Sequence, residues 1–176
     1  MRYKTYYDSP LGKIILESDG ENLTVLKFEC HRFYKEEKIT LNNELNIFIE
    51  TKNWLDKYFT GEKPSTKKLK LVPNGNEFRQ NVWKILQNIP YGKTVTYGNI
   101  AKQIAIKMGK KSMSAQAIGN AVGYNPISII IPCHRVVGAN GSLTGYGGGI
   151  KNKLKLLELE NVDMSSLYIP TKGNAL

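Results

Sequence analysis

Hydrophobic positions alternate with polar ones over short spans near the start of the chain and recur at helical spacing further along. Residues 13–17 and 23–28 are short runs rich in aliphatic and β-branched residues, and the sequence Ser18-Asp19-Gly20 between them favours a tight turn. This pattern predicts a β-hairpin. Apolar residues then return every three or four positions, which predicts an amphipathic helix packed on that sheet; the stripe is Ile47, Thr51, Trp54, Leu55, Tyr58 and Phe59.

Three more helices are predicted in the second half of the chain. Asn76 can cap the first of them, with Glu77 in its first turn. Its buried face would consist of Phe78, Val82, Trp83, Leu86 and Ile89, and Pro90-Tyr91-Gly92 would end it. Residues 96–105 and 114–122 follow as a pair, capped by Thr96 and by Ser112 or Ser114 and separated by a glycine-containing break. The pair predicts a helix-turn-helix.

Residues 60–76 show neither the alternation of a β-strand nor the three-to-four-residue spacing of a helix. They contain two glycines and two prolines, which is typical of a connection between domains. We therefore predict an α/β (α+β) fold. Its parts would be an N-terminal scaffold domain over 1–75 that includes a linker at 60–75, a mainly helical domain over 76–162, and a C-terminal tail over 163–176.

The net charge of +10 is concentrated in the second half of the chain. Residues 1–76 carry a net charge of +2, and residues 77–176 carry +8. From Phe78 to Leu157 there is no aspartate or glutamate, whereas eleven lysines and arginines remain. Such a stretch favours a polyanion as partner, although a merely solvated basic surface is the alternative.

The second helix of the predicted helix-turn-helix is rich in small residues, which are Ala115, Ala117, Gly119 and Ala121. Small side chains weaken a helix but let its backbone lie close to another surface. In a basic domain that surface could be DNA, and a close helix-helix contact would explain the same residues.

Cys133 follows an apolar run and Pro132, and precedes His134 and Arg135. A nucleophilic cysteine needs a neighbouring base or positive charge, and these two residues offer both. A buried structural cysteine remains the alternative. Because the apolar run should place the thiol inside, a DNA base could reach it only by rotating out of the duplex, at a cost of a few kcal/mol.

The tripeptide Cys-His-Arg occurs a second time at Cys30-His31-Arg32, so the two copies hold every cysteine and histidine of the chain. Zinc ligands normally lie two to four residues apart, because adjacent side chains point apart. We expect no metal site, and expect Cys30 and His31 to belong to the scaffold. Two distant cysteines also indicate a reducing, cytoplasmic setting, and we expect the protein to be nucleoid-associated when it is bound to DNA. Neither a secretory signal nor a membrane span is expected.

The segment Ile131-Pro132-Cys133-His134-Arg135-Val136-Val137 resembles the active-site signature of the O6-alkylguanine-DNA alkyltransferases, or methylated-DNA–protein-cysteine methyltransferases. The resemblance extends to residues 91–97, 123–126 and 141–149, and it runs from about Glu77 to Glu160. It implies a ribonuclease-H-like N-terminal domain and a winged helix-turn-helix-like C-terminal domain. The first half is similar to that scaffold only in its length and its strand-turn-strand start.

The resemblance implies direct DNA repair. A monomer without a cofactor would flip O6-methylguanine out of double-stranded DNA and transfer the methyl group irreversibly to Cys133, with O4-methylthymine as a further candidate substrate. His134 would deprotonate the thiol through a water, and Glu160 would orient the histidine. Tyr97 would donate a proton to the leaving guanine, and Asn125 would brace the turn before the cysteine. Each molecule would act once.

The remaining roles that the resemblance implies concern the damaged base and the duplex. Tyr146, Gly147, Gly148 and Val136 would contact the base. Ala115, Gln116, Ala117, Asn120, Arg135 and Thr96 would contact DNA. Gln116 stands where many family members have an arginine that enters the minor groove, so it could hydrogen-bond the orphaned base but would bring no charge.

Two other classes of protein fit parts of the sequence. A cysteine hydrolase could use Cys133, His134 and Glu160, but the acid-free half argues for a polyanionic substrate. A helix-turn-helix binding module without chemistry gives no reason for a cysteine between Pro132 and His134. Alkyltransferase-like binding proteins lack this cysteine, which is present here.

Overall fold

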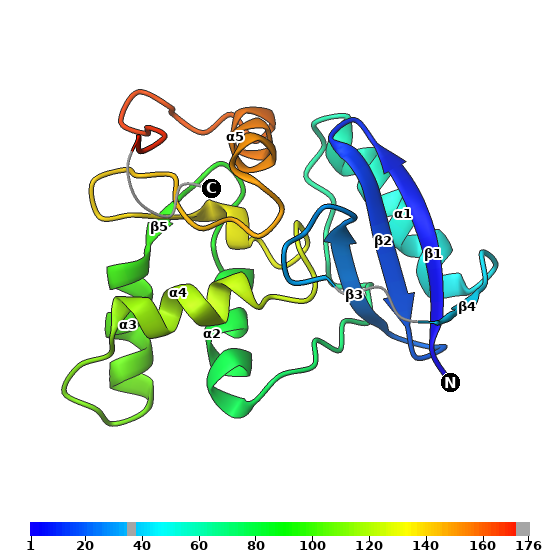
Figure 1. The fold of residues 1–176 in the computed structure, drawn as a ribbon, viewed down its shortest axis with the longest axis horizontal. Helices are drawn as coiled ribbons and strands as arrows, with labels where there is room; N and C mark the ends of the chain where they lie inside the picture. Colours follow the sequence, from blue (N-terminus) through cyan, green and yellow to red (C-terminus); the bar gives the residue numbers. More distant parts are fainter. Residues whose placement is uncertain (35–37, 172–176) are drawn as a thin grey trace. The chain divides into compact units, whose positions relative to one another are not determined.

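The computed structural model describes residues 1–34 and 38–171. The chain forms two compact units, shown in Figure 1. The first comprises Met1–Asn74 together with Pro126–Ile130, and the second comprises Gly75–Asn125 and the chain from Ile131 onward. Pro126–Ile130 thus belong to the first unit although they come from the second half of the sequence. The sequence did not predict this.

The first unit contains a four-stranded sheet with the order β3-β2-β1-β4. Its strands are β1 (Tyr3–Ser9), β2 (Gly12–Ser18), β3 (Leu23–Phe28) and β4 (Thr40–Leu41). The expected hairpin is confirmed as β2 and β3, which pair antiparallel. β1 pairs antiparallel with β2 and parallel with β4. The central strand β2 is buried from Ile14 to Ser18, so both of its faces are covered.

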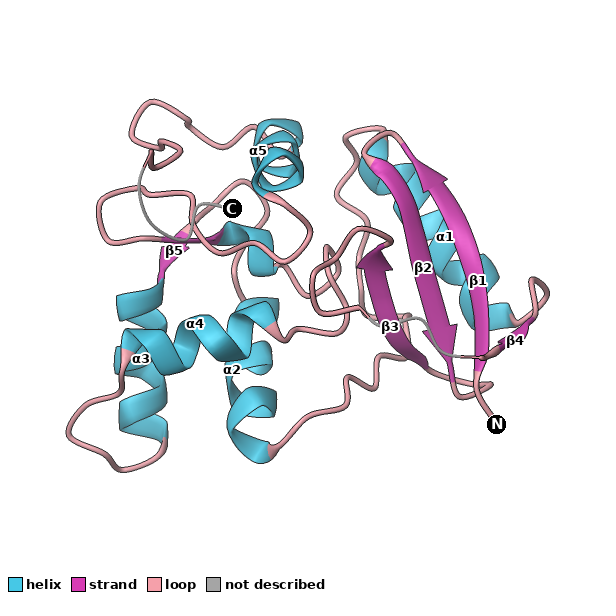
Figure 2. Ribbon diagram, viewed as in Figure 1, coloured by secondary structure: helices cyan, strands magenta, loops and turns pink. Residues whose placement is uncertain are grey.

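The predicted amphipathic helix is confirmed as α1 (Asn46–Phe59), which packs against β1 and β2. Its buried side chains are Ile47, Phe48, Thr51, Trp54, Leu55 and Tyr58. Thr51 fits this apolar stripe because its hydroxyl donates to the backbone oxygen of Ile47 at 2.7 Å. Figure 2 shows α1 lying behind the strands of this sheet.

Two segments distant in sequence pair with β3. The backbone N–H of Leu23 donates to Lys70, and the N–H of Val72 donates back to Leu23. The N–H of Leu26 donates to Pro126 at 2.9 Å, and the N–H of Ser128 donates to Leu26 at 2.7 Å. The end of the expected linker at 60–75 is therefore attached to the sheet.

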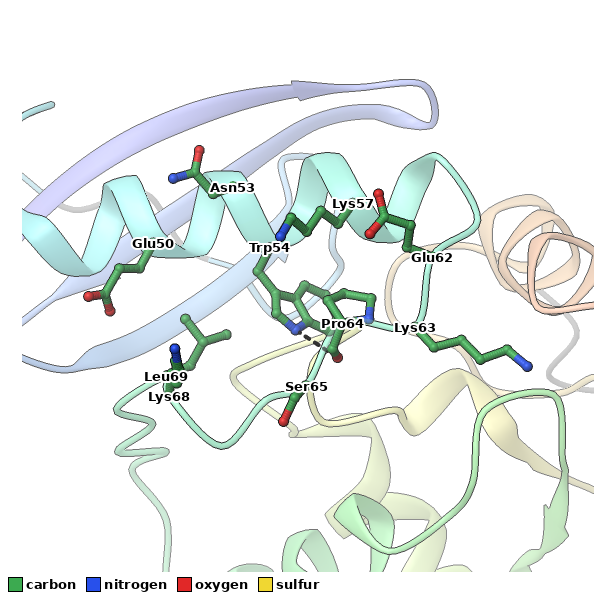
Figure 3. Close-up of a pocket in the computed structure, with 10 residues that line it drawn as sticks. All are labelled: Glu50, Asn53, Trp54, Lys57, Glu62, Lys63, Pro64, Ser65, Lys68 and Leu69. Carbon is green, nitrogen blue, oxygen red and sulfur yellow. Dashed lines mark hydrogen bonds between the residues drawn. The ribbon is translucent and has the colours of Figure 1, made fainter.

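A surface pocket of about 420 Å³ lies in the first unit, beside α1 (Figure 3). The indole N–H of Trp54 donates to the backbone oxygen of Pro64 at 3.2 Å, and both residues line the pocket. The charged residues around it carry both signs; they are Glu50, Glu62, Lys57, Lys63 and Lys68. The pocket contains neither a cysteine nor a histidine.

Up to residue 171, where the described part of the chain ends, the second unit contains four α-helices and a short two-stranded parallel sheet. The helices are α2 (Glu77–Gln87), α3 (Tyr97–Lys107), α4 (Ala115–Gly123) and α5 (Ile150–Leu159), and the strands are β5 (Val95–Thr96) and β6 (Val136–Val137). The three predicted helices are confirmed. The side chains of Asn76, Thr96 and Ser114 each accept a backbone N–H at the start of α2, α3 and α4. α5 was not predicted.

The core of the helical part lies between α2, α3 and α4. Trp83 on α2 is fully buried, and its indole N–H donates to the backbone oxygen of Ala121 on α4 at 2.8 Å. The side of α4 that carries Ile118, Ala121 and Val122 is buried. The opposite side is open, so the small residues of α4 serve a close helix contact and leave a free face as well.

The segment expected to be a tail is partly packed. Met164 and Leu167 pack against a buried cluster of Val137, Leu143 and Leu157. The backbone N–H of Leu143 donates to Tyr168 at 2.8 Å. In the described ranges 1–34 and 38–171, no helix is both long and apolar enough to cross a membrane.

Candidate active site

Cys133 lies at the start of a short 3-10 helix, η1 (Cys133–Arg135), immediately after a tight turn. Pro132 has φ −80° and ψ 65°, and the N–H of Cys133 donates to the backbone oxygen of Ile131 at 2.8 Å. These values define an inverse γ-turn, which the fixed φ of proline favours. The turn buries the thiol, and the residue is only 5% exposed.

Asn125, two residues after the end of α4, holds this turn through a hydrogen bond. The residue is 1% exposed, and its side-chain amide donates to the backbone oxygen of Ile131 at 2.8 Å. A buried carbonyl that lost this partner would cost free energy, so the bond fixes where the chain turns toward Cys133. The geometry fits the bracing role that the resemblance implies.

His134 and Glu160 form a buried pair. Nε2 of His134 lies 2.8 Å from Oε1 of Glu160, and both side chains are fully buried. Burial lowers the pKa of His134 more than the carboxylate of Glu160 raises it, so the ring is neutral at pH 7. Since Nε2 faces a carboxylate, it carries the proton and Nδ1 keeps a lone pair. No described residue hydrogen-bonds to Nδ1.

Glu160 also binds Arg135 in a bidentate arrangement. Nε and Nη2 of Arg135 donate to the two carboxylate oxygens at 2.8 and 2.9 Å, and the N–H of Gly92 donates at 3.2 Å. Burial alone would raise the pKa of Glu160, but the hydrogen bonds and charges of His134 and Arg135 hold it well below its usual range. Glu160 is 1% exposed, so its carboxylate is a buried partner of these groups and not a solvent-exposed charge.

From the sequence we expected Arg135 to offer a positive charge to Cys133 and to contact DNA, but the structure gives it other partners. It is 9% exposed, and it also donates to the backbone oxygen of Ile89. Its charge is therefore compensated by the carboxylate of Glu160. The same bonds turn the guanidinium inward, so its geometry does not fit the expected DNA contact; Arg135 holds Glu160 in place.

Tyr97, at the start of α3, reaches the loop that follows β6. Its hydroxyl donates to the backbone oxygen of Thr144 at 3.3 Å. A side chain at Gly145 would begin 3.6 Å from that hydroxyl, and Gly145 has φ +67°, which favours glycine. Tyr146, Gly147 and Gly148 continue the loop and are buried. The structure thus brings Tyr97 against the loop that carries the expected base-contacting residues.

Val136 and Thr144 are joined by a residue that the sequence reasoning missed. Nζ of Lys153 on α5 donates to the backbone oxygens of Val136 at 2.6 Å and Thr144 at 3.1 Å. Lys153 is 1% exposed. Lys153 shares one helical stripe with Leu156, Leu157 and Glu160, spaced three, four and seven residues along, but only the two leucines of that stripe give an apolar signal.

The residues expected at DNA fall in two places within the second unit. Ala115, Gln116 and Asn120 are exposed and Ala117 is half-buried on α4. Thr96 is half-buried, and its hydroxyl caps α3 by accepting the N–H of Asn99 at 3.1 Å. The open side of α4 is thus a helix face with little side-chain bulk, preceded by Ser114 as N-cap.

The other Cys-His-Arg lies in the turn after β3. Cys30 is exposed, whereas His31 is buried and its Nδ1 accepts the N–H of Phe33 at 3.2 Å. Burial, together with the charges of Lys27 and Arg32, lowers the pKa of His31 to about 3. Over the part of the chain that the structure describes, no three side chains of histidine, cysteine, aspartate or glutamate are grouped as metal ligands.

Two family models together match nearly the whole chain. The ribonuclease-like domain of 6-O-methylguanine DNA methyltransferase matches residues 2–73, and the DNA-binding domain of 6-O-methylguanine DNA methyltransferase matches residues 77–162. The chain belongs to this methyltransferase family. The resemblance read from the sequence is confirmed, including its extension to the first half, where the sequence alone was a weak guide.

Named relatives of this methyltransferase span nearly its full length. The methylated-DNA–protein-cysteine methyltransferase of Haemophilus influenzae is 41% identical, over 91% of this chain and 87% of the relative. That of Methanosarcina acetivorans is 42% identical, over 90% and 97%. The crystal structure of Mycobacterium tuberculosis OGT in complex with DNA is 42% identical and superposes with a TM-score of 0.80, covering 90% of this chain and 92% of that chain.

Proposed function

We propose that this methyltransferase repairs DNA directly, by transferring the methyl group of O6-methylguanine in double-stranded DNA to the sulfur of Cys133. The thiolate attacks the methyl carbon, so a carbon–sulfur bond forms and the carbon–oxygen bond breaks. The electron pair of that bond stays with guanine, which takes up a proton. These atoms and electrons balance without a cofactor, and O4-methylthymine would react in the same way.

The observation that carries this proposal is a buried thiol beside a neutral, oriented histidine. The lone pair on Nδ1 of His134 is available to accept the thiol proton through a bound water, while Glu160 holds the opposite nitrogen at 2.8 Å. Glu160 then stabilises the imidazolium that forms. A thiol that served only as packing would not need this arrangement.

Tyr97 would donate the proton that guanine takes up, because a phenol at the rim of the loop over residues 144–148 can hydrogen-bond a base held there. Asn125 would keep the turn before Cys133 in place. Tyr146, Gly147 and Gly148 would enclose the flipped base, and the glycine backbone lets it approach closely. The side chain of Val136 would form an apolar edge of the same site.

DNA would bind at the open side of α4. Ala115, Gln116, Ala117 and Asn120 lie on the side of α4 that has no large apolar side chain, within a stretch free of carboxylates over 78–157. Because Cys133 is 5% exposed, the damaged base must leave the duplex to reach it. Gln116 would occupy the space that the base vacates. We further propose that the protein acts as a monomer in the cytoplasm.

The deciding experiment is the intact mass of the protein after incubation with a duplex containing one O6-methylguanine. We expect a gain of one methyl group, located on Cys133 by peptide mapping, and no second gain on further incubation. Cys133→Ala should gain nothing, and Cys30→Ser, which removes the other thiol, should react like the unaltered protein. A gain in Cys133→Ala, or none in the unaltered protein, would contradict the proposal.

A further inference from the structure

Lys153 is a buried cation that the reaction described above does not use. It is 1% exposed and belongs to the buried side of α5, together with Leu156 and Leu157. Lysine is almost never fully buried without a partner for its charge, because an ammonium loses its hydration there. Its two hydrogen bonds go to the neutral carbonyls of Val136 and Thr144. Within residues 1–34 and 38–171, no carboxylate pairs with it.

The other charges near Cys133 are already compensated. Arg135 and Glu160 neutralise each other in their bidentate pair. His134 is neutral at pH 7, since burial lowers its pKa, and the positive charge of Lys153 lowers that pKa further. A thiolate formed at Cys133 would therefore find neither of its sequence neighbours as a free positive charge.

Lys153 and Cys133 interact electrostatically. Burial lowers the pKa of Lys153 to about 8, and the charge of Cys133 acts in the opposite direction and raises it. Such a coupling is reciprocal: if the thiolate favours the ammonium, the ammonium favours the thiolate by the same free energy. The structural basis is that α5 packs against η1, and the ammonium binds the carbonyl three residues after the cysteine.

We propose that Lys153 is a positioning residue that supplies the positive charge stabilising the Cys133 thiolate and that holds the Thr144 carbonyl beside Tyr97. The second part follows from a shared acceptor, because the oxygen of Thr144 binds both the ammonium and the Tyr97 hydroxyl. One side chain thus connects the nucleophile with the loop expected to enclose the base. The inference rests on the proposed role of Cys133 as acceptor.

The test measures thiol reactivity without DNA, so that it is independent of the repair reaction. In a Cys30→Ser background, the alkylation of Cys133 by iodoacetamide is followed by intact mass from about pH 5 to pH 10. For Lys153→Met we expect the apparent pKa of the thiol to rise by about one unit or more, and the rate at neutral pH to fall about tenfold. Lys153→Arg, which keeps the charge, should recover most of the rate.

Lys155→Met is the matched control, since Lys155 is exposed on the same helix. It should leave the thiol pKa unchanged. An unshifted thiol pKa in folded Lys153→Met, or an equal shift in Lys155→Met, would overturn the proposal. A folded Lys153→Arg as slow as Lys153→Met would also overturn it, because the charge would then be irrelevant.

A second measurement leaves Lys153 in place and covers the case in which Lys153→Met does not fold. The ε-carbon resonance of Lys153 is titrated by NMR in the Cys30→Ser protein and in Cys30→Ser/Cys133→Ser. Loss of the thiolate should lower the pKa of Lys153, and an unchanged value would overturn the proposal. Failure of methyl transfer from DNA with both titrations as expected would instead contradict the proposed function alone.

Discussion

Nε2 of His134 and Oε1 of Glu160 lie 2.8 Å apart, and neither side chain is accessible to solvent. The pair joins η1 to the C-cap residue of α5, twenty-six positions along the chain. Because Glu160 also receives two hydrogen bonds from Arg135, one carboxylate both orients the imidazole and neutralises a buried guanidinium.

Replacing Glu160 with Gln should therefore impair both reaction and stability. The amide cannot neutralise Arg135, and a buried charge that loses its partner costs about 3–5 kcal/mol. The imidazolium formed in the reaction would also lose its counter-charge, so methyl transfer should slow by at least about tenfold. Single-turnover transfer from a methylated duplex and denaturant unfolding measure the two effects.

Glu158→Gln is the control for that experiment, because Glu158 is exposed on the same helix two residues earlier. It removes the same charge and should change neither the rate nor the free energy of unfolding by more than a few tenths of a kcal/mol. Equal effects at both positions would mean that only net charge matters.

Asn125→Ala should destabilise the protein and displace the thiol. The change leaves the buried oxygen of Ile131 without its 2.8 Å partner, which costs about 1–3 kcal/mol. The turn before Cys133 would relax, so the rate of methyl transfer should fall more than the loss of folded protein explains. Urea unfolding and transfer rates normalised to folded protein check this. Asn88→Ala, at an exposed helix end, should behave like the unaltered protein.

The elements that the sequence predicted are those whose signals are local. α2 and α3 begin at residues whose side chains cap them, and their apolar stripes are regular. α5 begins after Gly149 without any side-chain cap, and its buried side contains Lys153. A helix is predicted from apolar residues at its buried positions, and a lysine at one of them interrupts that stripe. For this reason α5 was not predicted.

The residues of the candidate site also fall into two groups: those that are adjacent in the sequence and those that only the fold brings together. Cys133 and His134 are adjacent, so their chemistry could be considered from the sequence alone. Glu160 entered only through the family resemblance, because no local pattern shows that a residue twenty-six positions away is buried against His134. The bidentate pairing of Arg135 with Glu160 was not predicted for a related reason: whether a cation is free depends on a partner that only the fold brings to it.

Gln116→Arg should increase repair of duplex DNA more than reaction with the free alkylated base. Gln116 is exposed on the open side of α4, and arginine would add a charge that can enter the minor groove and contact phosphate. Binding should depend more steeply on salt, with the log-log slope changing by about −0.9 for one added contact. Rates on both substrates and salt-dependent affinities test this.

Gln103→Arg adds the same charge at an exposed position on α3 and is the matched control. For Gln103→Arg, the reaction rate with duplex DNA should not increase more than the rate with the free alkylated base. If both variants raise the duplex rate equally, general electrostatic attraction explains the gain, and a groove-inserting role for residue 116 is contradicted.

His31 should make the protein sensitive to mild acid. Burial holds its pKa at about 3, below the usual value of 6.5, so between these values the unfolded chain binds a proton that the folded protein does not. The free energy of unfolding should therefore fall as the pH decreases from about 6.5, with this residue contributing on the order of 2–3 kcal/mol between pH 7 and pH 4.

His31→Asn should remove that contribution, because its amide oxygen can accept the N–H of Phe33 in place of Nδ1 without titrating. The variant should be less stable at pH 7 owing to lost packing, but its stability should fall less steeply toward pH 4. Urea unfolding at intervals of pH measures both slopes, and His134 is present in both proteins, so its contribution cancels. Parallel curves would show that His31 does not titrate on unfolding.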